Sequence, residues 1–304
     1  MSKVATLGEM VRNHVRDGDV LFVGGFGQNV PFAIGAEIIR QKRRELTLCR
    51  TGADILFDLL IAAGVVRKVV VGWIGNPGIG LNHAFTRALR EGKIEIEESS
   101  NFTILLRLMA GALGVPFMPT RTLTAGDIPK RLSDARPMRC PFTDERLTAV
   151  KALKPDVAIV HAQRADPDGN LQSWGILGDT IEGVGASSRV IATVEEIVSR
   201  DTIRAAPEKT VVPGWRVAAI AQVEFGAHPS YSQGYYDRDD EFYQAYDHLA
   251  RDAASLDQWI DDHIRKTGDW DEHLRLIGRE RIESLVRRGR SNARNSRGAD
   301  AGLS

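Results

Sequence analysis

The segment Val20–Pro31, which reads VLFVGGFGQNVP, decides the fold class of this chain of 304 residues. Its apolar run Val20–Val23 ends at the glycine pair Gly24–Gly25, and an amphipathic stretch from Pro31 to Arg43 follows. A continuous apolar run of this length is typical of a strand that is buried on both faces, and the amphipathic stretch is typical of a helix that covers it. The segment therefore predicts a βα unit of a parallel sheet.

The same order of apolar run and helical stretch recurs along the chain. It predicts strands at Leu46–Cys49, Val69–Val71, Asp156–Val160 and Arg189–Val194, and helices at Ile55–Ala63 and His83–Arg90. We therefore expect an α/β fold with an open, mostly parallel sheet and helices on both faces. In such sheets, ligands bind beyond the carboxyl ends of the strands.

The carboxyl-terminal part of the sequence has a different pattern. Residues 239–288 have helical periodicity and many charges, and residues 287–304 combine five arginines with Ser, Asn and Gly. We expect one domain over residues 1–286 and a disordered, solvated arginine-rich tail over residues 287–304. Contact of this tail with RNA or an acidic partner is the less favoured interpretation.

Composition excludes several classes of protein. The chain has 40 Lys+Arg and 40 Asp+Glu, so its net charge is zero, which argues against binding to nucleic acid or to an anionic membrane. Its longest apolar stretch, around Leu56–Val66, is interrupted by Asp58 and is too short to span a membrane. Cys49 and Cys140 form neither a disulfide framework nor a metal-ligand spacing, so we expect a cytoplasmic protein without a metal site.

Five loops carry the residue types that bind ligands or catalyse reactions: Val23–Pro31, Gly72–Gly78, Glu95–Thr103, His161–Asn170 and Gly226–Ser230. The first loop allows close approach of the backbone to a ligand, although a plain tight turn explains it equally well. It is neither a P-loop nor a complete dinucleotide fingerprint. Ser100 and Asn101 are good helix caps, and a lone histidine such as His161 is more often a structural group than a base.

Taken in order, these loops resemble the alpha subunit of a family I coenzyme A transferase, most closely of the glutaconate CoA-transferase type. The resemblance runs to about Leu285. It rests on DGD at 17–19 leading into GGF at 24–26, AGALGVPF at 110–117, DVAIVHAQ at 156–163 with Asp168 and Gly169, VEEIV at 194–198 and GAHPS at 226–230.

The resemblance implies a two-chain enzyme that moves CoA between an acyl-CoA and a carboxylic acid. The partner would be a beta subunit of related fold, in a hetero-oligomer of two or four alpha-beta pairs. In that family the beta subunit supplies a glutamate that attacks the acyl-CoA and becomes a glutamyl-CoA thioester, which is nucleophilic catalysis by a carboxylate. Coenzyme A enters as a thioester substrate, and no cofactor is permanently bound.

Under this resemblance the chain is the half without the nucleophile. It has no Glu-Asn-Gly, and neither Glu182-Gly183 nor Glu224-Phe225-Gly226 falls where the family places the nucleophile. The resemblance assigns binding of CoA or substrate to Gly24, Gly25, Phe26, Gly27, Asn76 and Ser100. Val30 stands where the family usually has a glycine, which affects the details of these contacts.

Asn101 is the one residue that the resemblance gives a supporting catalytic role, as an amide donor near the reacting acyl group. The family usually has glutamine at this position. A related branch, the steroid-ring-opening hydrolases, has a glutamate there that acts as a base. The Asn101 amide does not take up a proton near neutral pH, so this residue favours transfer over ring cleavage.

Other functions remain open at the level of sequence. A CoA-thioester hydrolase or a ring-opening carbon–carbon hydrolase would use the same scaffold, and a CoA-ester-binding subunit without turnover is a third hypothesis. The sequence does not identify the acid. Trp73, Phe102 and Trp174 either narrow an acyl pocket or belong to the core.

Overall fold

The main sheet of the protein is built from parallel strands. A computed structural model describes residues 2–124, 128 and 132–300. Across the sheet the parallel strands follow the order β12-β10-β8-β1-β2-β3-β4. Their bounds are β1 Val20–Val23, β2 Leu46–Ala53, β3 Val66–Ile74, β4 Glu95–Glu98, β8 Val157–Ala165, β10 Arg189–Ile197 and β12 Val217–Gln222. Two short strands, β9 Leu171–Gln172 and β11 Thr210–Val212, continue antiparallel from the end of β8.

The strand order reverses between β1 and β8. From β1 the chain runs outward through β2 and β3 to β4, and it then returns to β8, which pairs with the other side of β1. From β8 it runs outward again to β10 and β12. Because successive crossovers leave this point in opposite directions, the carboxyl ends of β1 and β8 border a crevice, the usual ligand site of open parallel sheets.

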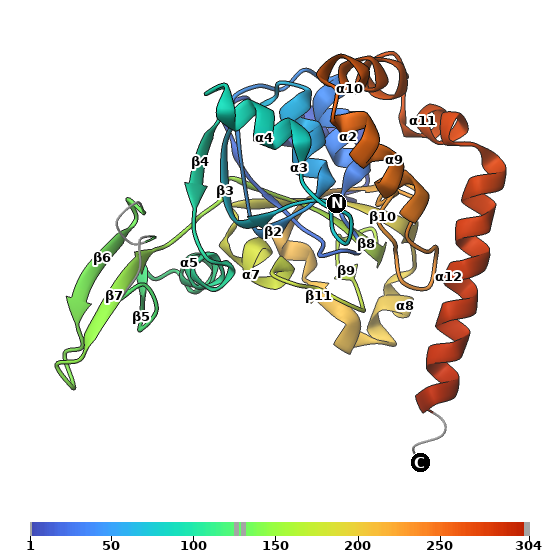
Figure 1. The fold of residues 1–304 in the computed structure, drawn as a ribbon. Coiled ribbons are helices and arrows are strands. Elements are labelled where there is room, and N and C mark those ends of the chain that lie inside the picture. Colours follow the sequence, from blue (N-terminus) through green and yellow to red (C-terminus); the bar gives the residue numbers. More distant parts are fainter. Residues whose placement is uncertain (1, 125–127, 129–131, 301–304) are drawn as a thin grey trace.

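Helices cover both faces of the sheet (Figure 1). Leu21, Leu48 and Val69 pack into one core, and the adjacent residues Phe22 and Cys49 pack into a second core on the opposite face. The first face carries α1 Leu7–His14, α2 Phe32–Arg40, α3 Ile55–Ala62 and α4 His83–Arg90, and the second carries α5 Asn101–Leu113 and α7 Thr180–Ala186. This arrangement confirms the predicted α/β class with helices on both faces.

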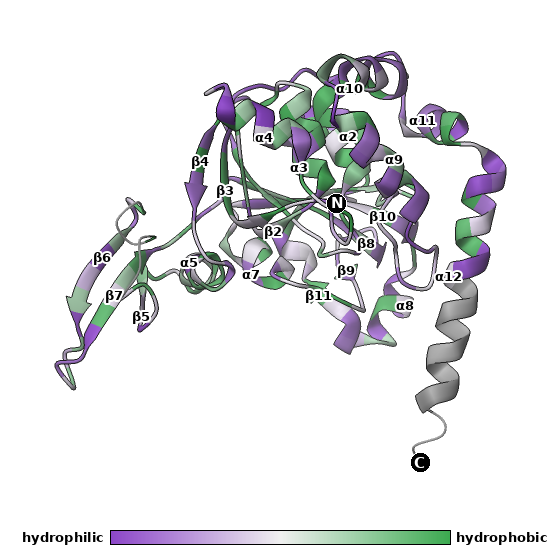
Figure 2. Ribbon diagram, in the orientation of Figure 1, coloured by the Kyte–Doolittle hydropathy of each residue, from purple (hydrophilic) through white to green (hydrophobic). Residues whose placement is uncertain are grey.

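The carboxyl-terminal helices extend the first face. They are α9 Asp240–Ala250, α10 Ala253–Ile260, the π-helical turn η3 Asp261–Arg265, α11 Trp270–Ile277 and α12 Arg279–Asp300; shorter elements are α8 Arg200–Arg204, η1 Pro207–Lys209 and η2 Gly214–Arg216. Tyr243, Leu256 and Trp270 join the core over the sheet. Hydrophobic residues gather on α2 and α3, whereas β4 and the coloured part of α12 are largely hydrophilic (Figure 2).

Helix α12 includes most of the segment for which the sequence predicts disorder. The backbone is helical from Arg279 to Asp300, and residues 301–304 lie outside the described part of the chain. The disorder prediction rests on the low hydrophobicity of this segment, because a polar helix has no apolar face to pack against a core. Arginine and alanine nevertheless have high helix propensity, and this propensity favours a helical backbone. Neither α12, which is strongly polar, nor any other helix within the described residues has the length and hydropathy to span a bilayer.

A small antiparallel sheet stands out from the body (Figure 1). It consists of β5 Phe117–Thr120, β6 Ala135–Arg139 and β7 Arg146–Lys151, in the order β5-β7-β6. The sequence analysis does not predict this lobe. Its strands are short and half exposed, and two of them contain a proline (Pro119 and Pro137), so the apolar runs that reveal the main strands are missing.

Arg107 joins the lobe to the main sheet. This residue of α5 is 2% exposed, and its guanidinium pairs with Glu97 of β4 and, at 2.8 Å, with Asp134 beside the lobe. Its Nε also donates to the carbonyl of Lys151 at the end of β7. A single buried cation therefore connects the sheet edge, α5 and the lobe.

Replacing Arg107 by alanine is expected to lower the free energy of unfolding by about 3–5 kcal/mol, because it leaves two carboxylates without their buried cation. Chemical denaturation followed by circular dichroism measures this loss. Arg136→Ala is the matched control, since Arg136 is exposed on the lobe and, among the described residues, bonds only to nearby carbonyls. Equal losses in the two variants would contradict the role of Arg107.

Candidate active-site surface at the carboxyl edge of the sheet

The glycine-rich loop after β1 forms a tight turn whose tip faces solvent. Gly25 and Gly27 have φ angles of 81° and 72°, a backbone region that disfavours other residues. The Phe26 N–H donates to the Gln28 carbonyl at 3.0 Å, which closes the turn. The Phe26 side chain at the tip is 42% exposed. The turn interpretation is therefore correct, and the turn leaves an aromatic ring exposed at its tip.

The buried side chain of Arg50 holds this loop in place. Arg50 lies in β2, its side chain is 1% exposed, and its guanidinium donates to the carbonyl oxygens of Gly24 and Gly25. Asp179 lies 3.5 Å from the guanidinium and also accepts from the N–H of Thr51 at 2.7 Å. The first residues of the loop are therefore held by a buried ion pair between β2 and the start of α7.

A network of side-chain amides fixes the second half of the loop. Asn29 donates to Gln163 Oε1 at 2.9 Å and to Ser173 Oγ at 3.1 Å. Gln28 donates to the carbonyls of Trp174 and Ile176 at 2.7 and 3.0 Å. These contacts tie the loop after β1 to the segment after β8, across the point where the strand order reverses.

Asn101 begins helix α5 and is exposed. Ser100 caps this helix, since its Oγ accepts from the N–H of Thr103 at 3.1 Å. A side chain on Gly72 would place its Cβ 2.3 Å from Asn101 Oδ1, so glycine at 72 leaves the room that Asn101 occupies. The capping interpretation holds for Ser100, whereas the Asn101 amide is available to a ligand.

Exposed aromatic rings lie beside the glycine loop and at the start of α5. Phe26, Trp73 and Phe102 are 42%, 47% and 50% exposed, so Trp73 and Phe102 are not core residues. A Cβ on Gly52 would meet the Phe26 ring at 3.2 Å and the Trp73 ring at 3.8 Å, which places these rings side by side over the end of β2. The result is an apolar surface that this chain leaves uncovered.

Two residues singled out in the sequence are buried and bonded within the protein. Asn76 is 2% exposed, and its amide donates to the Tyr243 carbonyl at 2.9 Å, so it fastens the loop after β3 to α9. His161 is buried, with Nε2 2.7 Å from Glu195 Oε1 and Nδ1 2.9 Å from Thr193 Oγ1. The structural interpretation of His161 is favoured because both ring nitrogens are engaged. Asn76 as a contact to CoA stays a prediction.

Asp54 and Cys49, both in the segment that includes β2, are buried. Neither side chain is therefore an accessible nucleophile. Burial raises the pKa of the Asp54 carboxyl group, which caps α3 by accepting from the Leu56 N–H at 3.0 Å. Burial likewise raises the pKa of the Cys49 thiol. Both groups lie beneath the surface, where they contribute to packing and capping.

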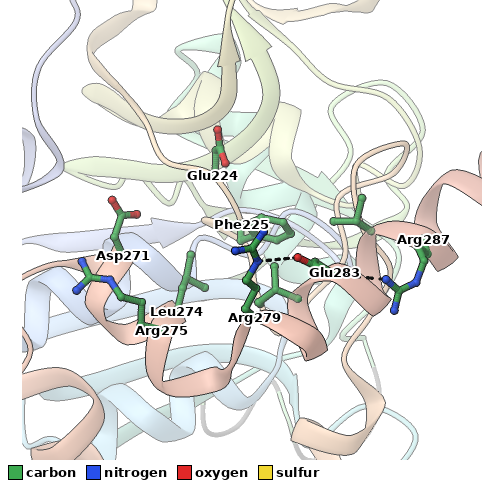
Figure 3. Close-up of a pocket in the computed structure, with 10 residues that line it drawn as sticks. Glu224, Phe225, Asp271, Leu274, Arg275, Arg279, Glu283 and Arg287 are labelled. Atoms are coloured by element: carbon green, nitrogen blue, oxygen red, sulfur yellow. Dashed lines mark hydrogen bonds and ion pairs between the residues drawn. The ribbon is translucent and has the colours of Figure 1, made fainter.

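Cavities also occur away from the glycine loop. One, of about 640 Å³, lies between Phe225 and helices α11 and α12 and has Glu224 at its border (Figure 3). Behind the glycine loop, by contrast, the cavity bordered by Gly25, Asn29 and His161 measures about 10 Å³, room for no more than one water molecule. A substrate at the glycine loop must therefore lie on the exposed aromatic surface in front of it.

Arg50 and Asp179 shape the site but are absent from the sequence-based prediction, and Gln163 enters that prediction only as part of the loop His161–Asn170. The sequence contains one indication that Arg50 matters: it is a charged residue inside the otherwise uncharged segment LTLCRTGA of β2. A charge in a strand that is buried along its whole length needs a partner, and this requirement marks the residue. Asp179 and Gln163 leave no comparable signal, because only the folded chain brings them to the loop.

Comparison with known proteins finds matches over nearly the whole chain. A family model described as coenzyme A transferase matches residues 4–222. In Pseudomonas knackmussii, one chain of 3-oxoadipate CoA-transferase is 43% identical over 275 residues, 90% of this chain and 97% of that protein. In Acidaminococcus fermentans, one chain of glutaconate CoA-transferase is 32% identical, over 94% of this chain and 95% of that protein. The crystal structure of glutaconate coenzyme A-transferase from the same organism has a TM-score of 0.87 at 31% identity, over 93% of this chain and 95% of that chain.

Alanine at Gly25 and at Gly27 should have different effects on stability. Both positions have positive φ, so each substitution costs about 1 kcal/mol of backbone strain. A Cβ at position 25 would also lie 2.4 Å from the Asn29 carbonyl oxygen, whereas nothing lies within 4 Å at position 27. We expect Gly25→Ala to cost about 2 kcal/mol more than Gly27→Ala in chemical denaturation. Equal costs would mean that the loop is not held as described.

Proposed function

The chain belongs to the coenzyme A transferase family, and from this premise we propose that it is the alpha subunit of a two-chain CoA-transferase. The enzyme moves CoA from an acyl-CoA to a carboxylic acid. The acyl-CoA and the acid are its substrates, and the glutamate nucleophile belongs to the partner chain, the beta subunit. We further propose that the complex contains two or four alpha-beta pairs.

The exposed surface at this edge of the sheet, with Asn101 at the start of α5, carries this proposal. Its aromatic rings Phe26, Trp73 and Phe102 are each about half exposed, and the cavity behind the loop is too small for a substrate. Anhydride and thioester intermediates react with water, so the reaction needs a closed, dry site with fixed donors. A second chain placed over this surface supplies both the cover and the nucleophile.

The proposed reaction proceeds through carboxylate attack. A carboxylate oxygen of the partner's glutamate attacks the thioester carbonyl carbon, the C–S bond breaks, and CoA leaves as a thiolate. The thiolate then attacks the glutamyl carbonyl of the resulting anhydride, which releases the first acid and forms glutamyl-CoA. The acceptor carboxylate repeats these steps in reverse order. Each attack places negative charge on a carbonyl oxygen.

Asn101 is suited to stabilise that charge. Its side-chain N–H groups donate hydrogen bonds, and its position in the first turn of α5 adds the partial positive charge of a helix N-terminus. Since the amide does not accept a proton near neutral pH, it does not act as the base of a hydrolase. This residue supports transfer in preference to hydrolysis or ring cleavage.

The substrate class follows from the relatives. 3-Oxoadipate and glutaconate are both dicarboxylates, and they name the enzymes to which the two similar chains belong. We propose a dicarboxylic acid or its monothioester as a substrate of this enzyme. A panel of acyl-CoA donors with dicarboxylate and monocarboxylate acceptors tests this choice.

In the reconstituted complex, Asn101→Ala is expected to lower kcat about 100-fold, the usual effect of losing a donor to a developing oxyanion. Asn101→Gln, which restores an amide with a longer reach, should recover part of the activity. Gel filtration of the complex tests whether assembly is retained. Unchanged turnover in Asn101→Ala with intact assembly would refute the role of Asn101.

Acceptor dependence separates transfer from hydrolysis. With acyl-CoA alone, a transferase stops after one turnover, whereas a hydrolase continues to release free CoA. Adding acetate or succinate should restart the transferase. Mass spectrometry of the stalled complex should find CoA attached to the partner chain, and continuous CoA release without acceptor would refute transfer.

A further inference from the structure

Two cations flank an aromatic ring next to the glycine loop. Arg164, near the end of β8, has its Cζ 5.6 Å from the centre of the Trp174 ring. Lys209, at the end of η1, has its Nζ 5.4 Å from the same ring centre. The two positive groups are therefore at most about 11 Å apart, held near one another by cation–π contacts with a single side chain.

The backbone around this cluster is fixed. Trp174 Nε1 donates to the Gln233 carbonyl at 3.1 Å, and the N–H of Ser173 donates to the Lys209 carbonyl at 3.0 Å. Arg164 donates from Nε to Gln172 Oε1 at 2.8 Å, while its terminal NH₂ groups make no hydrogen bond to the described residues. The cluster is therefore preorganised, and it keeps hydrogen-bond donors available for a ligand.

The positive charge of Lys209 is not neutralised by an ion pair within the described residues. Glu196 pairs in register with Arg164 in the adjacent strand and accepts a hydrogen bond from Tyr235, so it offsets part of the Arg164 charge. Lys209 is exposed and forms no ion pair with any carboxylate of the described residues. Other cations at this edge are engaged internally: Arg50 with the glycine loop, and Arg238 with Asp240 and the Pro77 carbonyl.

The cluster continues the proposed substrate surface. The Trp174 carbonyl accepts hydrogen bonds from Gln28 of the glycine loop and from Gln163, so Trp174 is directly fastened to that loop. In the strand order β3-β2-β1-β8, Asn101 beside β3 and Arg164 near the end of β8 lie on opposite sides of the loop after β1. A molecule that has its thioester at Asn101 and passes over the loop therefore extends toward Arg164 and Lys209. Among common thioester substrates, CoA has the length and the terminal phosphates to do so.

We propose that Arg164 and Lys209, positioned by Trp174, bind the phosphates at the adenosine end of coenzyme A. The inference rests on the proposed function and specifies its CoA site. Three phosphate groups at this end carry most of the negative charge of CoA, and they need cations with free donors. The Trp174 ring holds the two cations and does not stack on the adenine.

Binding of CoA to the complex of this chain with its partner tests the proposal without requiring turnover. In equilibrium dialysis, Lys209→Gln is expected to raise the Kd of CoA about fivefold to tenfold, as loss of one charged hydrogen bond predicts, and Lys209→Glu should raise it further. Neither variant should change the Kd of pantetheine, which lacks the phosphates. Lys154→Gln, an exposed lysine at the opposite end of β8, is the matched control.

Kinetics separate this site from the proposed function. If transfer occurs, Lys209→Gln should raise KM for acyl-CoA and leave both kcat and KM for acyl-pantetheine unchanged. A Kd for CoA equal to that of the unaltered complex in both Lys209 variants would overturn the phosphate site while leaving transfer intact. Weaker CoA binding in a complex that shows no transfer would support the phosphate site and refute the proposed function.

Discussion

The candidate site depends on the buried guanidinium of Arg50. It holds the carbonyl oxygens of Gly24 and Gly25 and is itself held by Asp179. Asp179 stands at the N-cap position of α7, but its carboxylate faces Arg50 and the Thr51 N–H and does not cap its own helix. Losing one member of such a pair leaves a buried charge alone, which costs about 3–5 kcal/mol. The geometry of the loop is therefore tied to the packing of β1, β2 and α7.

The elements predicted by continuous apolar runs agree closely with the structure. Strand β1 spans the predicted Val20–Val23, and α4 spans the predicted His83–Arg90. The apolar run predicts that β2 ends at Cys49, but the strand continues to Ala53, because the charge of Arg50 interrupts the run without interrupting the strand. Burial on both faces explains why the strand begins with an apolar run. The ion pair of Arg50 with Asp179 allows the buried strand to continue beyond that run to Ala53.

The site is predictable only in part, for a related reason. Glycines that permit positive φ and residues that begin helices have local signatures, so the loop at Gly24–Gly27 and the start of α5 could be placed from sequence. Contacts between distant segments leave no such signature. Asn76 lies in a glycine-rich loop like the others, yet its amide reaches Tyr243 on α9, and the sequence offers no means of distinguishing this inward side chain from an outward one.

An open half-site suits the proposed exchange chemistry. The same surface must accept a bulky CoA thioester, release one acid and admit another, while water is kept from the intermediates. A deep cavity within one chain would exclude water but would hinder the exchange of acids past a bound CoA. In the proposed enzyme, an exposed aromatic surface on this chain that the partner chain closes would separate the two requirements: the rings would provide the dry floor, and the opening between the chains would provide the route for the acids. The exposed positions of Phe26, Trp73 and Phe102, which would be unfavourable on a chain that acts alone, follow from this division.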